Sequence, residues 1–204
     1  MNARPHNISR LSERAQAQKE RILSAAQTCF IEHGFHAAGM ALIAETAEMS
    51  PGLIYRYFDN KNAIILAIVD RQLENARTDI RALHHAPDLA AAALNAFDCW
   101  RRADPRLMNA ALFMEMNAEA SRNPELAAAL SSFDAEIQKE LTNWLTAPVS
   151  AGGKGLPAQL AAIRAISLKC FMEGLTARAL REPDIKPALL RAAITEFMAH
   201  LTAA

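Results

Sequence analysis

The residues with the clearest chemical potential lie in one short segment between Ser50 and Lys61. Arg56 and Tyr57 stand in its middle, and Gly52 stands near its start. An arginine can donate hydrogen bonds to a phosphate or a base edge, whereas a tyrosine hydroxyl or a lysine ammonium can contact a phosphate. A glycine lets the backbone approach a second molecule closely. The segment therefore predicts contact with double-stranded DNA.

Residues that would support catalysis are not grouped anywhere in the chain. The sequence has no Ser-His-Asp, Cys-His or paired-carboxylate pattern and no metal-ligand spacing, and His84-His85 stands in an expected loop. Cys29, Cys99 and Cys170 are widely spaced, which argues against a disulfide framework or a zinc site. We predict no enzymatic activity, no cofactor and no metal, and we interpret Cys99 and Cys170 as buried structural residues rather than a redox switch.

Composition sets further limits on the class of protein. The chain has 204 residues, about half of them apolar, and a formal net charge of zero, which argues against a general polyanion binder. It has no signal peptide and no apolar run that could cross a membrane, so we expect a cytoplasmic protein. Positive charge is concentrated near the N-terminus, at Arg4, Arg10, Arg14, Lys19 and Arg21. We interpret this segment as a solvated tail, with minor-groove contact by Arg10 or Arg14 as the less favoured alternative.

The elements that must position the polar segment are short helices. Apolar spacing predicts helices over about 12–33, 40–47, 51–58 and 61–83, with Gly34 at the positive-φ position that ends the first. Ser50 suits an N-cap and Pro51 the first turn. Two short helices joined by a tight turn describe a helix-turn-helix, over about 40–59.

The remaining sequence predicts an all-α body, which brings the whole chain to roughly nine helices. Proline punctuation and apolar spacing place its helices at about 88–103, 105–121, 124–147, 157–180 and 184–202. The connection 148–156 holds three glycines and is predicted to be long and flexible. We divide the chain into a flexible arm (1–15), a DNA-binding domain (16–80) and a ligand-binding and dimerisation domain (81–204).

The segment 19–70 resembles the tetracycline-repressor (TetR) family of bacterial transcription regulators. The family signature is a glycine-aromatic pair, an Ile-Ala pair and Ser-x-Gly-x-Leu-Tyr-x-Tyr-Phe-x-x-Lys. The resemblance implies a homodimer that represses transcription from a palindromic operator and is released by a small molecule. The matching positions are Gly34-Phe35, Ile43-Ala44, Ser50, Gly52, Ile54, Tyr55, Tyr57, Phe58 and Lys61.

Three positions depart from the family pattern. Ala38-Gly39 replaces a Thr-Ser pair that would cap the first short helix, and Glu48 occupies a turn position usually held by glycine. If Glu48 takes a positive φ, the strain is about 1 kcal/mol. Leu53 replaces a frequently polar residue and suggests apolar contact with a thymine methyl group.

The predicted DNA contacts follow from the segment and the resemblance together. Arg56 and Tyr57 are expected to point outward, and Lys61 to bind a phosphate. Tyr55 is included, although its spacing favours the core, where Phe58 also belongs. The candidate DNA-binding residues are Gly39, Ser50, Pro51, Gly52, Leu53, Tyr55, Arg56, Tyr57 and Lys61.

The methionine- and aromatic-rich body is a candidate ligand pocket, with plain core packing as the alternative. The ligand would be a small apolar or amphipathic molecule. Glu115 could meet a cationic ligand, although surface exposure or an ion pair with Arg102, Arg106 or Arg122 is the favoured alternative. The candidate pocket residues are Phe97, Trp100, Met108, Leu112, Phe113, Glu115, Met116, Phe133 and Phe171.

The last two helices carry apolar residues on more than one side, which predicts a dimer interface, or else a monomer with a well-buried hairpin. The candidate interface residues are Ile163, Cys170, Gly174, Ala177, Leu190, Ala193, Ile194, Phe197 and Leu201. The alternatives to a ligand-released repressor are a DNA-binding protein of the same fold without a ligand and, less favoured, a helical enzyme.

Overall fold

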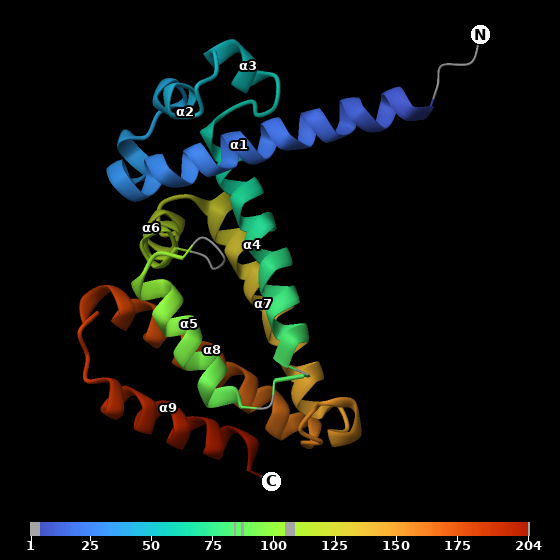
Figure 1. Cartoon of the computed structure of the whole chain (residues 1–204), viewed down its shortest axis with the longest axis vertical. Coiled ribbons are helices and arrows are strands. Elements are labelled where there is room, and N and C mark those ends of the chain that lie inside the picture. Colours follow the sequence, from blue (N-terminus) through green and yellow to red (C-terminus); the bar gives the residue numbers. More distant parts are fainter. Residues whose placement is uncertain (1–4, 84, 87, 105–108, 204) are drawn as a thin grey trace.

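The computed structural model describes residues 5–83, 85, 86, 88–104 and 109–203, and within these ranges the chain is helical with no strand. The helix α1 (Pro5–Ala37) crosses one end of the molecule, as Figure 1 shows. It already begins at Pro5, so the predicted flexible arm is helical over its described part. At Gly34 the backbone leaves the helix with φ 74° and ψ 165°, which confirms the predicted positive φ.

Three short elements complete the end of the molecule that we call the head. They are α2 (Met40–Thr46), α3 (Pro51–Tyr55) and the first turns of α4 (Lys61–Leu83). The predicted inward face of α1 is buried, with Ile22 and Phe30 fully shielded from solvent. This face supports the two short helices, which are too short to be stable alone.

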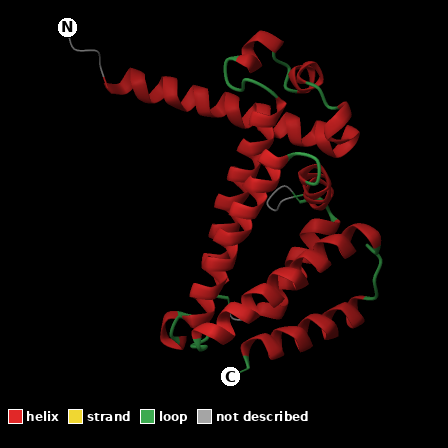
Figure 2. Ribbon diagram, turned by 180° about the vertical axis from the view of Figure 1, so that it is seen from behind, coloured by secondary structure: helices red, strands yellow, loops and turns green. Residues whose placement is uncertain are grey.

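The body consists of the rest of α4 and five further helices. They are α5 (Leu89–Arg101), α6 (Ala110–Ala120), α7 (Pro124–Thr146), α8 (Ala158–Arg181) and α9 (Pro187–Thr202). The helix α4 packs along α7, whereas α5 lies on α8 and α9, an arrangement visible in Figures 1 and 2. The side chains of Asp88, Asn109 and Asn123 cap α5, α6 and α7. No described helix has the length and apolar character needed to cross a bilayer.

Two apolar cores hold this arrangement together. The second core lies wholly in the body, where Trp144 and Ile194 are almost completely buried. The first core fills the head, but it also contains Leu112 and Met116 from α6 and Leu126 from α7. The first core therefore spans the head and the adjoining part of the body, since α6 packs directly on α1.

The connection between α7 and α8 is a hydrogen-bonded turn, so the prediction of a flexible connection is wrong. It contains a short 3-10 helix, Val149–Ala151. The Gly153 amide donates to the Pro148 carbonyl at 3.1 Å, and the Gly155 amide donates to the Ala147 carbonyl at 2.8 Å. The indole of Trp144 donates to the Gly152 carbonyl at 3.2 Å. The glycines allow close backbone approach here rather than mobility.

Candidate nucleic-acid interface

The helix α3 is positioned by its cap and by one buried side chain. Ser50 Oγ accepts a hydrogen bond from the Leu53 amide at 3.3 Å, and Pro51 stands in the first turn, as predicted. Ile54 is fully buried and shares the first core with Ala44 and Ala47 of the preceding element. The small alanine side chains let the two short helices approach closely. This packing fixes the position of the exposed face of α3 relative to α2.

The predicted DNA-binding residues divide into an exposed and a half-buried set. Tyr55 is 52% exposed, so the interpretation that favoured a core position is wrong. Tyr57 instead packs against the first core, because α3 ends at Tyr55 and the chain turns back there. Leu53, Tyr57 and Lys61 are half-buried. The exposed residues are Gly39, Ser50, Pro51, Gly52, Tyr55 and Arg56.

Lys61 has a structural partner inside the protein. Its ammonium group donates a hydrogen bond to the carbonyl of Phe35, the residue that follows the bend at Gly34. Asn60 Oδ1 accepts from the Ala63 amide at 2.9 Å, which caps α4. Lys61 therefore ties the start of α4 to the end of α1, and the predicted phosphate contact would use its remaining donors.

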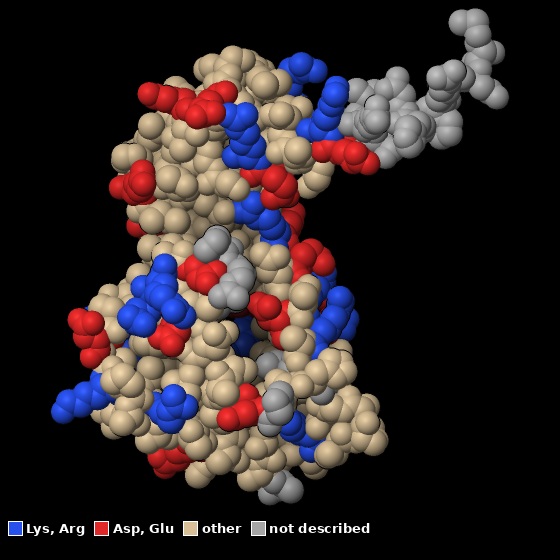
Figure 3. Space-filling view, viewed as in Figure 1, with Lys and Arg blue, Asp and Glu red and all other residues tan. Residues whose placement is uncertain are grey.

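The turn between α2 and α3 has the positive φ that the sequence analysis considered for Glu48. Glu48 adopts φ 51°, in the left-handed region that favours glycine. Its carboxylate pairs with Arg21 at 2.7 Å on the surface. Figure 3 shows acidic and basic side chains interspersed on the visible face of the head. The visible face of the head is therefore not uniformly basic.

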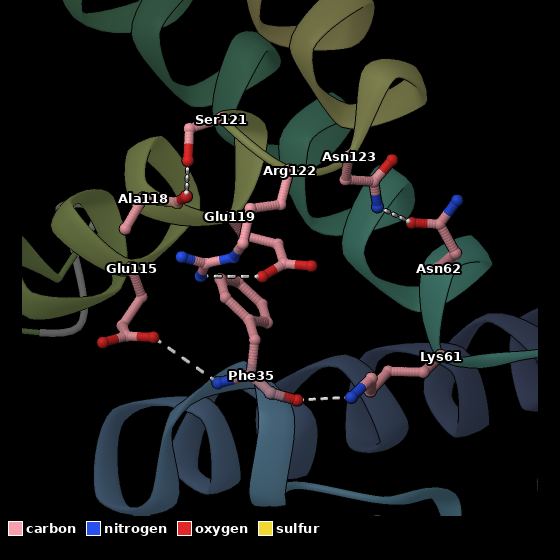
Figure 4. Close-up of polar contacts among 9 residues, drawn as sticks. All are labelled: Phe35, Lys61, Asn62, Glu115, Ala118, Glu119, Ser121, Arg122 and Asn123. Atoms are coloured by element: carbon pink, nitrogen blue, oxygen red, sulfur yellow. Dashed lines mark hydrogen bonds and ion pairs between the residues drawn. The ribbon is translucent and has the colours of Figure 1, made fainter.

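The junction between head and body is polar where α1 meets α6. Figure 4 shows Glu115 of α6 directed at the backbone of Phe35, where its carboxylate accepts from the amide at 3.4 Å. Glu119 pairs with Arg122 at 3.2 Å, so Arg122 is not the partner of Glu115. Glu115 does not line the small inner cavity described below. Its carboxylate contacts the backbone of the head instead, and its place in a ligand pocket stays a prediction.

We expect Glu115→Ala to loosen this junction. The Phe35 amide would lose an acceptor worth on the order of 1 kcal/mol, so its hydrogen exchange should become about fivefold faster. NMR-detected exchange on the full chain measures this directly. The matched variant Glu115→Gln keeps an acceptor oxygen and should stay close to the wild-type rate. Equal exchange rates in wild type and Glu115→Ala would contradict the assignment.

A small inner cavity of about 40 Å³ lies among α4, α6, α7 and α8. Three of the predicted pocket residues line it, namely Phe113, Met116 and Phe133. Gln72 and Glu173 add polar groups to its wall. Burial raises the pKa of Glu173, and the nearby Asp134 carboxylate raises it further, whereas Lys169 opposes the shift.

The other predicted pocket residues do not line this cavity. Leu112 is fully buried in the first core, and Phe97 in the second. Trp100 packs on the second core, and Phe171 stacks on Phe197 with ring centroids 3.9 Å apart. Met108 lies outside the described residues. Gln72 was missed because it stands in a mostly polar run of α4, residues 70–75, where the sequence does not distinguish a buried polar residue from its exposed neighbours.

The two last helices expose part of the predicted interface. Ile163 is 56% exposed, and Cys170, Gly174 and Ala193 are also exposed, whereas Ala177 and Phe197 are half-buried. The exposure of Cys170 corrects its interpretation as a buried residue. Leu190, Ile194 and Leu201 are buried in the second core, so their assignment to the interface is wrong. Three further exposed apolar residues of these helices were not among the candidates, namely Ile166, Leu180 and Leu189.

Comparison with known proteins agrees with this architecture. Residues 22–68 match the family model described as bacterial regulatory proteins, tetR family, and residues 101–203 match the C-terminal model of BetI-type transcriptional repressors. The regulator UidR of Escherichia coli is 32% identical over 129 residues, which cover 61% of this chain and 63% of that relative. The chain therefore aligns with less than two thirds of that relative's length.

Solved structures extend the likeness over nearly the whole chain. Salmonella enterica GusR is 29% identical, with a TM-score of 0.69, over 90% of this chain and 96% of that one. A putative transcriptional regulator from Pseudomonas aeruginosa shares the fold, with a TM-score of 0.68 and 23% identity, over 93% of this chain and 92% of that one. The family models cover both the head and the body, and the chain belongs to the tetR family of bacterial regulatory proteins.

Proposed function

We propose that this protein is a sequence-specific DNA-binding transcriptional repressor whose α3 enters the major groove. The observation that carries the proposal is the exposed face of α3, with Gly52, Tyr55 and Arg56 held outward while Ser50 caps the helix and Ile54 anchors it. Tyr55 and Arg56 supply a hydroxyl and a guanidinium for phosphates or base edges. Among the relatives, KstR of Mycolicibacterium smegmatis is named a transcriptional repressor.

The repressor acts as a homodimer through α8 and α9. Ile163 and Ile166 support this, because they lie one turn apart on α8 and both are exposed, and grouped exposed apolar side chains are typical of an interaction site. Leu189 of α9 is exposed as well. A Cβ added at Gly174 would meet no atom within 4 Å, which leaves room for a close helix crossing. Two-fold symmetry then implies a palindromic operator.

A small apolar or amphipathic ligand releases the operator by entering the inner cavity. FadR from Bacillus subtilis, which shares the fold, was solved in complex with stearoyl-CoA. A cavity of about 40 Å³ holds only water, so ligand entry must separate α6 from its neighbours. Because α6 also carries Glu115 to the Phe35 backbone, its displacement would move the head. The ligand can shift operator affinity only by its differential affinity for the two states.

The small size of the inner cavity favours one alternative, a DNA-binding regulator of the same fold that takes no ligand there. A screen for ligands that lower operator affinity separates the two. If a ligand competes with the operator for the protein, that result supports the proposal of a ligand-controlled repressor. A ligand that binds without changing operator affinity would not be the inducer.

Genomic footprinting of the wild-type protein tests the DNA-binding proposal. It should recover palindromic sites, and Arg56→Ala should then weaken binding to such a site about tenfold, since one base-edge or phosphate contact contributes about 1–3 kcal/mol. Arg101→Ala is the matched control, because that exposed arginine lies on α5 of the body. If wild-type protein protects no specific site, the proposed function fails.

A further inference from the structure

Two polar links join the head to the body beside the first core. In one link Asn123, the cap of α7, donates to Asn62 Oδ1 at 2.9 Å, and the Asn62 amide donates to the carboxylate of Glu125. In the other link Glu115 of α6 accepts from the Phe35 amide at 3.4 Å. Figure 4 shows the Asn62–Asn123 and Glu115–Phe35 pairs at separate places of the junction.

The two links attach different helices of the head to different helices of the body. Asn62 lies in the first turn of α4 and meets α7, whereas Phe35 lies at the end of α1 and meets α6. Lys61 ties the two head helices to each other, because its ammonium group donates to the Phe35 carbonyl. A single attachment would let the head rotate about it, and two separate attachments prevent this rotation.

The first core holds the head on the body but does not by itself fix the angle between them. Its body residues are apolar, namely Leu112, Met116 and Leu126. Apolar burial is non-directional, whereas a hydrogen bond requires a particular distance and angle. The core therefore supplies the attraction between the two parts, and the polar links select one orientation.

The length of α4 makes this orientation important for DNA binding. The helix has 23 residues and is about 34 Å long. A tilt of about 10° at its far end would move the head by about 6 Å, close to two base-pair steps of DNA. In a dimer joined through α8 and α9, the two copies of α3 must reach successive major grooves at a set separation.

We propose that the Asn62 and Glu115 links determine the half-site spacing that the repressor accepts. The inference rests on the proposed function of a homodimeric repressor. Asn62 and Glu115 are positioning residues, which select the operator through the angle of the head and without contact with DNA. An asparagine suits this place because its side chain both accepts from Asn123 and donates to Glu125.

Fluorescence anisotropy on the full-length protein tests the proposal. The DNA is a palindromic site recovered by footprinting, together with versions whose centre is one or two base pairs longer or shorter. The wild type should bind the altered sites about tenfold more weakly than the natural one. The double variant Asn62→Ala/Glu115→Ala should distinguish them by less than about threefold. A merely unstable protein would lose affinity for every site by the same factor and keep the wild-type ratio.

Asn75→Ala is the matched control, because this exposed asparagine lies further along α4. It should keep the wild-type ratio, and so should Glu125→Gln, which leaves an acceptor oxygen for Asn62. The inference is overturned if the double variant distinguishes the spacings as strongly as the wild type, or if Asn75→Ala relaxes the preference equally. Those results leave the proposed function intact, whereas wild-type protein that protects no specific site overturns both.

Discussion

Ile54→Ala should unfold the head and abolish operator binding, although Ile54 itself contacts no DNA. The side chain is fully buried, and it is the buried residue of the five-residue helix α3. Truncating a buried isoleucine costs about 2–5 kcal/mol, which corresponds to a fall in melting temperature of about 10 °C for a chain of this size. Without the buried Ile54 side chain α3 should lose its helical structure, since so short a helix is unstable alone.

Thermal unfolding and operator binding by fluorescence anisotropy measure the two effects on one sample. The control is Val149→Ala, in which an aliphatic side chain that is 74% exposed is truncated. That variant should keep both the wild-type melting temperature and the wild-type operator affinity. An Ile54→Ala protein that melts as the wild type does would show that α3 is held by other contacts.

Gly153→Ala should lower the free energy of unfolding by about 3 kcal/mol, an effect similar to that of Ile54→Ala. A Cβ at this position would lie 2.1 Å from the Ala147 carbonyl oxygen, a backbone atom that cannot move aside alone. The turn would have to open, and the hydrogen bonds from the Gly153 and Gly155 amides would be lost with it. The packing of Trp144 against the turn would suffer as well.

Urea unfolding of Gly153→Ala gives the free energy of unfolding for comparison with the wild type. Gly52→Ala is the matched control, because a Cβ there would meet nothing within 4 Å. That variant should be as stable as the wild type or slightly more so, because alanine favours helix. Equal stability of Gly153→Ala and wild type would mean that the turn adapts without cost.

Local chemistry made much of the head predictable. A serine before a proline specifies a helix start, and a glycine after a helical run specifies a positive φ, so Ser50, Pro51 and Gly34 were placed correctly. These features depend on neighbours in sequence. The order of the body helices followed for the same reason, since prolines and capping side chains mark their first turns.

The errors concern features that depend on contacts distant in sequence. A five-residue helix is too short for apolar spacing to set its rotation, so Tyr55 and Tyr57 were assigned to the wrong faces. In α9 the apolar residues surround the helix, and only packing separates Leu190 in the core from Leu189 in solvent. The glycines of the 148–156 turn suggested mobility, although two of their amides bond to the carbonyls of Ala147 and Pro148 at the start of the same turn, a pairing that apolar spacing does not reveal.

The shared first core also bears on the construction of chimeric regulators. Exchanging the head of one family member for that of another assumes that the two parts are interchangeable modules. Here Leu112, Met116 and Leu126 of the body complete the core of the head. A grafted head would meet foreign side chains at its own centre, so a hybrid built from this chain should carry its α6 and the first turn of its α7 along with its head.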